Sequence, residues 1–328
     1  MKPGTLILLL LATTLLAGCA GLSDQTITVG PPPPYAPKEI VVPTRAMPDA
    51  AIHIGPGATR VAVGESAVWI LQADRLLKID PQSNQVQMIV SKIRSSSSIA
   101  AGEGAVWVSD RSRLLKLDPQ TGRVLARLPV ACDNVAVGAG SVWAANPGKG
   151  TVVRIDPRTG LTLATIEVDR TPMVLAAGEG AVWVLCWETN AVCQIDPDLN
   201  RVVAKVPLGV GIPIGGMAVG EGGVWISKQA QLPLGAVNAL VVVDPRNQRV
   251  TKVFKTWFDG AFALGGGAVW VATPDQVARV DVASGRVVEK VLVPVGEYAD
   301  LAAGEDALWL ICDRSDTLWR INYAPPAP

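Results

Sequence analysis

The sequence predicts an all-β fold, a seven-bladed β-propeller made of four-stranded antiparallel blades. A motif that begins with Gly and ends in Val-Trp or Leu-Trp occurs seven times, at 64–69, 102–107, 138–143, 178–183, 220–225, 265–270 and 304–309. Its tryptophans follow one another at intervals of 38, 36, 40, 42, 45 and 39 residues, and a period near forty is typical of one blade. The 32 Gly and 25 Pro residues are spread along the chain without a three-residue period, which favours many short strands and tight turns.

The N-terminus predicts export from the cytoplasm. Met1-Lys2 supplies a positive charge, and an apolar run extends from Leu6 to Leu16 before the small residues Ala17 and Gly18. This order is typical of a secretory signal peptide, and the run is too short to span a bilayer comfortably. We therefore expect residues 1–18 to be a cleaved leader.

The segment Leu16-Ala17-Gly18-Cys19 resembles the lipobox of bacterial lipoproteins. The resemblance implies that Cys19 is acylated, with palmitate among its acyl chains, and becomes the first residue of the mature protein. Two or three acyl chains would hold the protein stably on a membrane of the cell envelope, on its periplasmic or extracellular side. Because Ala20 is not Asp, the outer membrane is favoured if the organism has one.

Residues 19–50 are expected to form a tether between the lipidated Cys19 and the folded body. The segment has no sustained hydrophobic period and contains four consecutive prolines at 31–34. Proline favours the extended polyproline II form, which suits a spacer. The propeller itself is expected at 51–328.

Within a blade, the segment from Ile99 to Val130 divides into four strands with a period of two. Turns between third and fourth strands have the form Asp-Pro-x-x-Gly or a close variant, at 118–122, 156–160, 196–200, 244–248 and 281–285. Asp accepts backbone N–H groups, and Gly or Asn tolerates the left-handed conformation, so these acids have a structural explanation. The last unit lacks a fourth strand, and residues 51–55 match one. We expect this N-terminal strand to complete blade seven and close the ring.

The repeats resemble the YVTN-type and streptogramin (virginiamycin B) lyase-like propeller repeats of bacterial extracytoplasmic proteins, as in segments 106–130 and 142–168. The resemblance covers about residues 51–323 and implies the fold, but propellers perform many functions. Known streptogramin lyases use histidines together with a glutamate and Mg²⁺ near the propeller axis. This chain has one His, and His53 lies in the expected outer closing strand. We therefore assign no catalytic residue, no metal ligand and no cofactor.

Side chains outside the repeat pattern predict a binding face. Loops that join the fourth strand to the next first strand, and the second strand to the third, should share one end of the ring. The candidate binding residues there are Trp187, Trp257, Phe258, Asp259 and Asp300. Exposed aromatics on loops are candidate anchors for a partner protein or for sugar rings, although they could instead cap the blades. Arg60, Asp133 and Asn134 belong to the same loops, and we interpret them as part of a solvated rim.

Cys186 and Cys193 flank a short predicted hairpin, so a cross-strand disulfide and two free thiols both stay open. The chain has 29 Lys plus Arg against 29 Asp plus Glu, which excludes a strongly basic nucleic-acid binder. The leading hypothesis is a monomeric, membrane-anchored, non-catalytic platform that binds an envelope protein. One alternative is a lyase or lactonase-like enzyme with Ca²⁺ or Mg²⁺ held in the funnel by Asp259 and Asp300. The other is a binder of cell-wall glycans.

Overall fold

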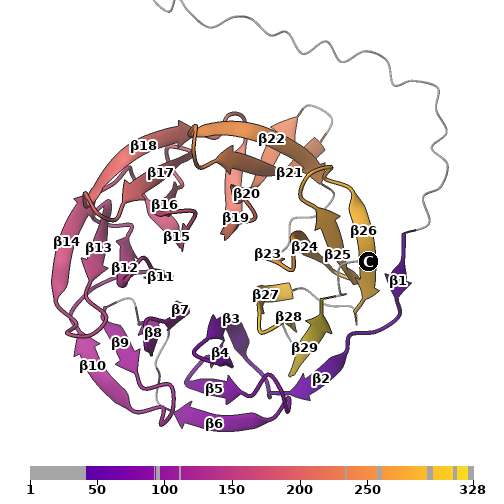
Figure 1. Ribbon diagram of the computed structural model, residues 1–328, viewed down its shortest axis with the longest axis horizontal. Helices are drawn as coiled ribbons and strands as arrows, with labels where there is room; N and C mark the ends of the chain where they lie inside the picture. The colour runs from indigo at the N-terminus through magenta and orange to yellow at the C-terminus, as the bar shows by residue number, and fades with distance from the viewer. Residues whose placement is uncertain are drawn as a thin grey trace, which may run out of the picture. The chain divides into compact units, whose positions relative to one another are not determined.

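The computed structural model describes residues 42–91, 93, 97–110, 112–232, 235–256, 261–293, 298–312 and 316–323. Every regular element in these residues is a β-strand, and the strands form seven sheets around a central axis (Figure 1). Each sheet contains four antiparallel strands in chain order from the axis outward, apart from the two sheets that the N-terminal segment joins. The predicted seven-bladed propeller is confirmed.

The blades follow one another around the ring in chain order. Blades one to three contain β3 (Ala58–Gly64), β4 (Ala67–Gln72), β5 (Arg75–Ile79), β6 (Val86–Ser91), β7 (Ser98–Gly102), β8 (Ala105–Ser109), β9 (Leu114–Leu117), β10 (Val124–Leu128), β11 (Asn134–Gly138), β12 (Ser141–Asn146), β13 (Thr151–Ile155) and β14 (Thr162–Glu167). Blades four to seven contain β15 (Pro172–Gly178), β16 (Ala181–Cys186), β17 (Ala191–Asp196), β18 (Arg201–Pro207), β19 (Ile212–Gly220), β20 (Gly223–Leu232), β21 (Gly235–Asp244), β22 (Arg249–Thr256), β23 (Phe262–Gly265), β24 (Ala268–Thr273), β25 (Gln276–Asp281), β26 (Val287–Leu292), β27 (Tyr298–Gly304), β28 (Ala307–Cys312) and β29 (Thr317–Asn322).

The tryptophan of each repeat packs between neighbouring blades. Each lies in the second strand of its blade and is at most 2% exposed. Trp107 of blade two, for example, packs with Val135 and Val142 of blade three. In six blades the indole N–H donates to the carbonyl of the first glycine of the motif, at 3.0 to 3.2 Å. In blade four the indole nitrogen of Trp183 is buried without such a bond.

A cation in the third strand joins four blades to the next one. These residues are Lys78, Lys116, Arg154 and Arg320, and each lies over the tryptophan ring of its own blade at 5.2 to 5.7 Å. Each also donates to the proline carbonyl of the Asp-Pro turn in the following blade, namely that of Pro119, Pro157, Pro197 and Pro81. The turn sequence and the third-strand cation therefore serve one contact, which combines a cation–π interaction with a charge-assisted hydrogen bond.

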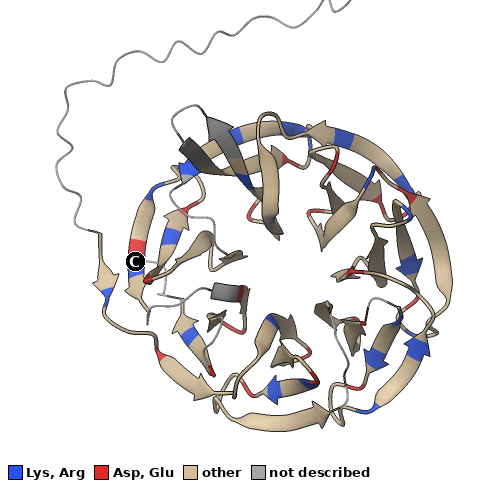
Figure 2. Cartoon of the chain, turned by 180° about the vertical axis from the view of Figure 1, so that it is seen from behind, with Lys and Arg blue, Asp and Glu red and all other residues tan. Residues whose placement is uncertain are grey.

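The glutamate of the motif makes a second contact between blades. Glu65 and Glu103 accept the backbone N–H of Gly104 and Gly140, at 2.9 and 3.0 Å. In the same way, Glu179 accepts the backbone N–H of Gly222 in blade five, and Glu221 accepts that of Gly267 in blade six. Figure 2 shows acidic residues at many of the turns, whereas Lys and Arg lie mainly on strands. These glutamates have a structural role because each joins its turn to the turn of the next blade.

The ring closes as the sequence predicts. β2 (Ala50–His53) pairs antiparallel with β29 as the outer strand of blade seven. Ile52 faces inward and Ile54 follows it; both are buried in a cluster shared by blades seven and one. The side-chain amide of Gln72 in blade one donates to the carbonyls of Ile54 and Gly55, each at 3.0 Å. The two ends of the propeller sequence are thus held together across one blade.

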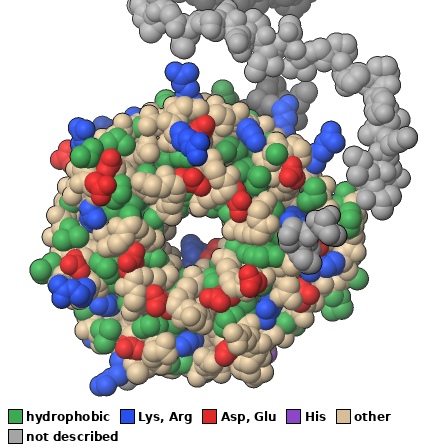
Figure 3. Space-filling model, viewed as in Figure 1, with side chains coloured by type: hydrophobic (Ala, Val, Ile, Leu, Met, Phe, Trp, Pro, Cys, Tyr) green, Lys and Arg blue, Asp and Glu red, His purple; other side chains and the backbone are tan. Residues whose placement is uncertain are grey.

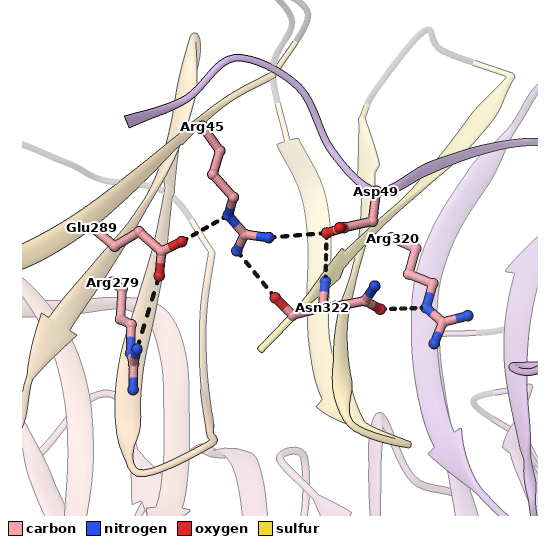
Figure 4. Close-up of polar contacts among 6 residues, drawn as sticks. All are labelled: Arg45, Asp49, Arg279, Glu289, Arg320 and Asn322. Atoms are coloured by element: carbon pink, nitrogen blue, oxygen red, sulfur yellow. Dashed lines mark hydrogen bonds and ion pairs between the residues drawn. The ribbon is translucent and has the colours of Figure 1, made fainter. Parts of the chain in front are cut away.

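A second N-terminal contact was not expected from the sequence. The tether was expected to continue to residue 50, but β1 (Thr44–Arg45) pairs in parallel with β26, the outer strand of blade six. Arg45 forms ion pairs with Glu289 at 2.7 Å and Asp49 at 3.0 Å, and donates to the carbonyl of Asn322 (Figure 4). The Asp49 carboxylate also accepts the Asn322 N–H at 2.8 Å. Residues 43–49 therefore belong to the ring and join blades six and seven.

Candidate functional site

A central cavity of about 820 Å³ lies at the end of the ring where the first strands begin. Residues of all seven blades line it, and the space-filling view shows the opening along the axis (Figure 3). The lining position with the clearest pattern is the residue four places before the first glycine of each repeat. In blade order it is Arg60, Ser98, Asn134, Val174, Gly216, Ala261 and Asp300.

This pattern divides the cavity wall into a polar and an apolar arc. The polar arc comprises blades seven, one, two and three, with Asp300, Arg60, Ser98 and Asn134. The apolar arc comprises blades four, five and six, and its lining residues include Met173, Leu175, Ile214, Met217 and Phe262. A concave wall with an apolar side and a few polar groups is typical of a binding site.

Three residues of the polar arc also join neighbouring blades. The carboxylate of Asp300 accepts the N–H of Val61 at 2.9 Å. The hydroxyl of Ser98 accepts the N–H of Val135 at 3.2 Å, and the amide oxygen of Asn134 accepts the N–H of Leu175 at 2.9 Å. These side chains therefore have a structural role in addition to lining the cavity.

Blade five contributes no side chain at this position because a neighbour fills the space. A Cβ on Gly216 would lie 2.6 Å from Cε1 of Phe262, which belongs to blade six. The Gly216 N–H instead donates to the hydroxyl of Ser227 at 3.0 Å. Phe262 is 7% exposed, so the apolar arc is partly filled by one ring.

Burial raises the pKa of Asp300 from its ordinary value of 3.8 to about 6, although the N–H groups of Val61 and Leu301 and the charge of Arg60 favour the carboxylate. The folded state thus holds this proton more tightly than the unfolded state. The contribution of Asp300 to the free energy of unfolding is therefore fully present below about pH 4 and is lost as the pH rises through about 6.

We predict that Asp300→Asn abolishes this loss, because the Asn carbonyl oxygen still accepts the Val61 N–H and carries no charge. Relative to wild type, the variant should gain about 2 kcal/mol of unfolding free energy between about pH 4.5 and pH 7.5. Urea denaturation at both pH values measures the difference. Parallel pH profiles of the two proteins would contradict the prediction.

The structure places Trp187 at the cavity. It follows β16 directly, lines the apolar arc and is 41% exposed. Asp300 lies on the opposite, polar arc. The predicted residues Trp257, Phe258 and Asp259, and the lipidation candidate Cys19, lie outside the described residues. Arg60, Asp133 and Asn134 all line the cavity, so the residues interpreted as a rim partly form its wall.

Two exposed aliphatic residues beside Trp187 were missed in the sequence. Val210 and Ile212 are 83% and 53% exposed and lie at the connection from blade four to blade five. Asn190 holds this connection to the Trp187 loop, since its side-chain amide donates to the carbonyls of Gly209 and Gly211 at 2.6 and 2.8 Å. Trp187, Val210 and Ile212 are called the Trp187 patch below.

The histidine and the two candidate disulfide cysteines also have clear positions. His53 lies in β2 on the outside of the ring, with Nδ1 3.5 Å from the Asp316 carboxylate. Cys186 and Cys193 lie on adjacent strands, with their sulfurs 3.9 Å apart. In the described part of the chain, no three His, Cys, Asp or Glu side chains gather as a metal site requires. The described residues also include no helix that is long and apolar enough to cross a membrane.

Comparison with protein-family models and with curated protein sequences finds no match for this chain. Among solved structures, the chain is similar to Kuenenia stuttgartiensis hydrazine synthase, with a TM-score of 0.70 and 13% identity over 83% of this chain and 97% of that one. The chain is also similar to the Cps50 (Swd1) β-propeller domain of Myceliophteria thermophila, with a TM-score of 0.68 and 11% identity over 84% of this chain and 99% of that one. A third similar structure is BamB from Moraxella catarrhalis, with a TM-score of 0.55 and 14% identity over 81% of this chain and 86% of that one. At these identities the similarity shows the propeller fold alone.

Proposed function

We propose that the protein is a lipid-anchored, non-catalytic propeller that binds a partner protein in the cell envelope through the end of the ring where the cavity opens. The observation that carries this proposal is the Trp187 patch: Trp187 lines the apolar arc of the cavity, and the exposed Val210 and Ile212 belong to the connection that Asn190 holds to the Trp187 loop. Trp, with a large apolar face and one polar N–H, is the side chain most often found to anchor a protein interface.

The position of the patch supports a specific site. Other exposed aliphatic residues, such as Leu125, Leu163 and Val253, lie on the outer strands of separate blades, where scattered apolar residues are normal. Trp187 and Val210 instead lie on loops that Asn190 joins, and Trp187 lines a cavity whose far wall is polar. The surface would suit a partner that presents an apolar side chain next to hydrogen-bonding groups.

Anchoring rests on the lipobox at 16–19. Replacement of Cys19 with Ser should move the protein from the membrane fraction to the soluble fraction of the envelope. Because the acyl chains supply the membrane affinity, the propeller should keep its melting temperature.

Chemical cross-linking in native membranes tests the platform. Tagged full-length protein would be compared with a Trp187→Ala, Val210→Ser variant and with a control, Leu163→Ala, Val253→Ser, which removes two other exposed apolar residues, both from the outer strands. We expect a reproducible partner with the wild type and the control, and its loss with the patch variant. The absence of any partner above background, or equal capture by both variants, would overturn the proposal.

The two alternatives differ in what they need from the same site. The glycan binder would also use Trp187, so purified peptidoglycan would retain the wild type and not the patch variant. The metal-dependent enzyme would need the carboxylate of Asp300, both oxygens of which accept backbone N–H groups. Stabilisation by Ca²⁺ or Mg²⁺ that Asp300→Asn abolishes would favour the enzyme over the platform.

A further inference from the structure

The two cysteines of blade four are placed as a reactive pair. Cys186 is the last residue of β16 and pairs in register with Ala191, while Cys193 pairs with Val184. The two cysteines are therefore diagonal neighbours on adjacent strands, and their side chains lie on the same face of the sheet. They are 0% and 1% exposed, in a cluster between blades three and four, and their sulfurs are 3.9 Å apart.

The other two described cysteines differ from this pair. Cys132 and Cys312 are also buried, but each lies without a second thiol beside it, and burial raises the pKa of both to about 11. In the pair, Cys186 donates to Cys193, and this bond lowers the pKa of Cys193 and raises that of Cys186. Hydrogen bonding with the Asp169 backbone and the charge of Lys205 also favour a Cys193 thiolate.

We propose that Cys186 and Cys193 form a disulfide that fastens the β16–β17 hairpin. The Cys193 thiolate attacks the disulfide of a thiol–disulfide oxidoreductase or of a small disulfide such as oxidised glutathione. A mixed disulfide forms, and one thiol of the oxidant leaves. Cys186 then loses its proton and attacks the Cys193 sulfur, which forms the intramolecular bond and releases the second thiol of the oxidant. The two cysteine thiols lose two electrons and two protons, and the oxidant is reduced to two thiols.

The burial of both sulfurs sets when this reaction occurs. Cys186 and Cys193 are 0% and 1% exposed, so an oxidant has no direct access to them in the folded blade. The exchange therefore takes place during folding, before blade three packs against blade four, or through local opening of the hairpin. Diagonal neighbours on antiparallel strands have Cα atoms about 7 to 8 Å apart, so closing the gap between the sulfurs from 3.9 Å to a bond of about 2 Å needs a shift of the two strands as well as of the side chains.

The disulfide would act on the segment that carries Trp187. Trp187 directly follows Cys186, and its N–H donates to the Thr171 carbonyl at 3.0 Å, while its carbonyl accepts the Asn190 N–H at 3.0 Å. A bond between residues 186 and 193 closes the chain around this turn. The disulfide would thereby restrict the exposed tryptophan before a ligand binds, and a pre-organised anchor lowers the entropic cost of binding.

A thiol map of the full-length protein from its native envelope tests the proposal. Membranes would be denatured in N-ethylmaleimide and digested with a glutamyl endopeptidase, which cuts after Glu188, between the two cysteines. We expect the peptides that hold Cys186 and Cys193 to remain linked until reductant is added, while Cys132 and Cys312 carry the maleimide. In a Cys186→Ser variant Cys193 should carry the maleimide, and in a Cys132→Ser variant the linked pair should remain.

Thermal unfolding provides a second measurement if a variant expresses poorly. Reductant should lower the melting temperature of the wild type by a few degrees, leave that of the Cys186→Ser, Cys193→Ser variant unchanged, and act on Cys132→Ser as on the wild type. Maleimide on both Cys186 and Cys193, in protein from the envelope and after incubation with excess oxidised glutathione, would overturn the proposal. That outcome would leave the partner-binding test unaffected.

Discussion

A chain that lacks residues 50–56 is expected to lose most of its folding stability. The deletion removes β2, the outer strand of blade seven, with the buried Ile52 and Ile54 and the carbonyls that Gln72 binds. Burial of two isoleucines alone contributes about 3 to 6 kcal/mol, and an unpaired β29 edge adds to the loss. Since a domain has a total of about 5 to 15 kcal/mol, the ring should melt at a much lower temperature or fail to fold. Thermal unfolding followed by circular dichroism measures the effect.

The two faces of the same strand provide a matched control. Ile52 faces the core and Ala51, next to it, faces solvent. We expect Ile52→Asp to reproduce much of the loss and Ala51→Asp to leave the melting temperature within a few degrees of the wild type. A deletion mutant with an unchanged melting temperature would show that the ring does not depend on its N-terminal strand.

The blade architecture could be predicted because each blade uses the same residues for the same contact. The first glycine and the tryptophan of the motif recur in all seven units, and a four-stranded unit is the simplest structure between them. The closing strand was visible because residues 51–55 match a fourth strand that the last unit lacks. Repetition thus carried most of the information about the fold.

Contacts that occur only once were not visible in the repeat. β1 has two residues and its sequence matches no blade strand, and only the partners Glu289 and Asn322, far along the chain, define its place. In the sequence Val210 is an ordinary loop residue. In the structure the Asn190 side chain holds its loop next to the loop of Trp187. Such contacts depend on side-chain partners that no other blade repeats, so the repeat pattern does not reveal them.

The division of the cavity wall could have been found in the sequence. Alignment of the seven repeats on their first glycine places Asp300, Arg60, Ser98 and Asn134 in consecutive blades, and Val174, Gly216 and Ala261 in the other three. The sequence alone does not reveal that the Asp300 carboxylate accepts the Val61 N–H between blade seven and blade one. The pattern was present, but its structural cause requires the neighbouring blade.

The glycine that begins each motif faces the first strand of the next blade, and its replacement should cost more where a new Cβ would lie closer to that strand. A Cβ on Gly64 would clash with the backbone carbonyl of Ala101 in blade two, whose carbon lies 2.9 Å away. At the same position in blade five, a Cβ on Gly220 would lie 3.5 Å from Leu264 Cδ1, an ordinary contact. We predict that Gly64→Ala destabilises the protein by about 2 to 4 kcal/mol more than Gly220→Ala does, as measured by urea denaturation.

The comparison isolates the packing between blades, because the two glycines have nearly the same backbone conformation, with φ of 158° and 153°. Any cost of fitting an alanine to that φ is common to both variants and cancels in the difference. A side chain can yield to a new methyl group, whereas the Ala101 carbonyl is part of the backbone of β7, which pairs with β8, and it cannot move without disturbing blade two. Equal losses in the two variants would mean that the glycine is needed for its backbone conformation; a larger loss at Gly64 would mean that the first strands pack too closely there for any side chain.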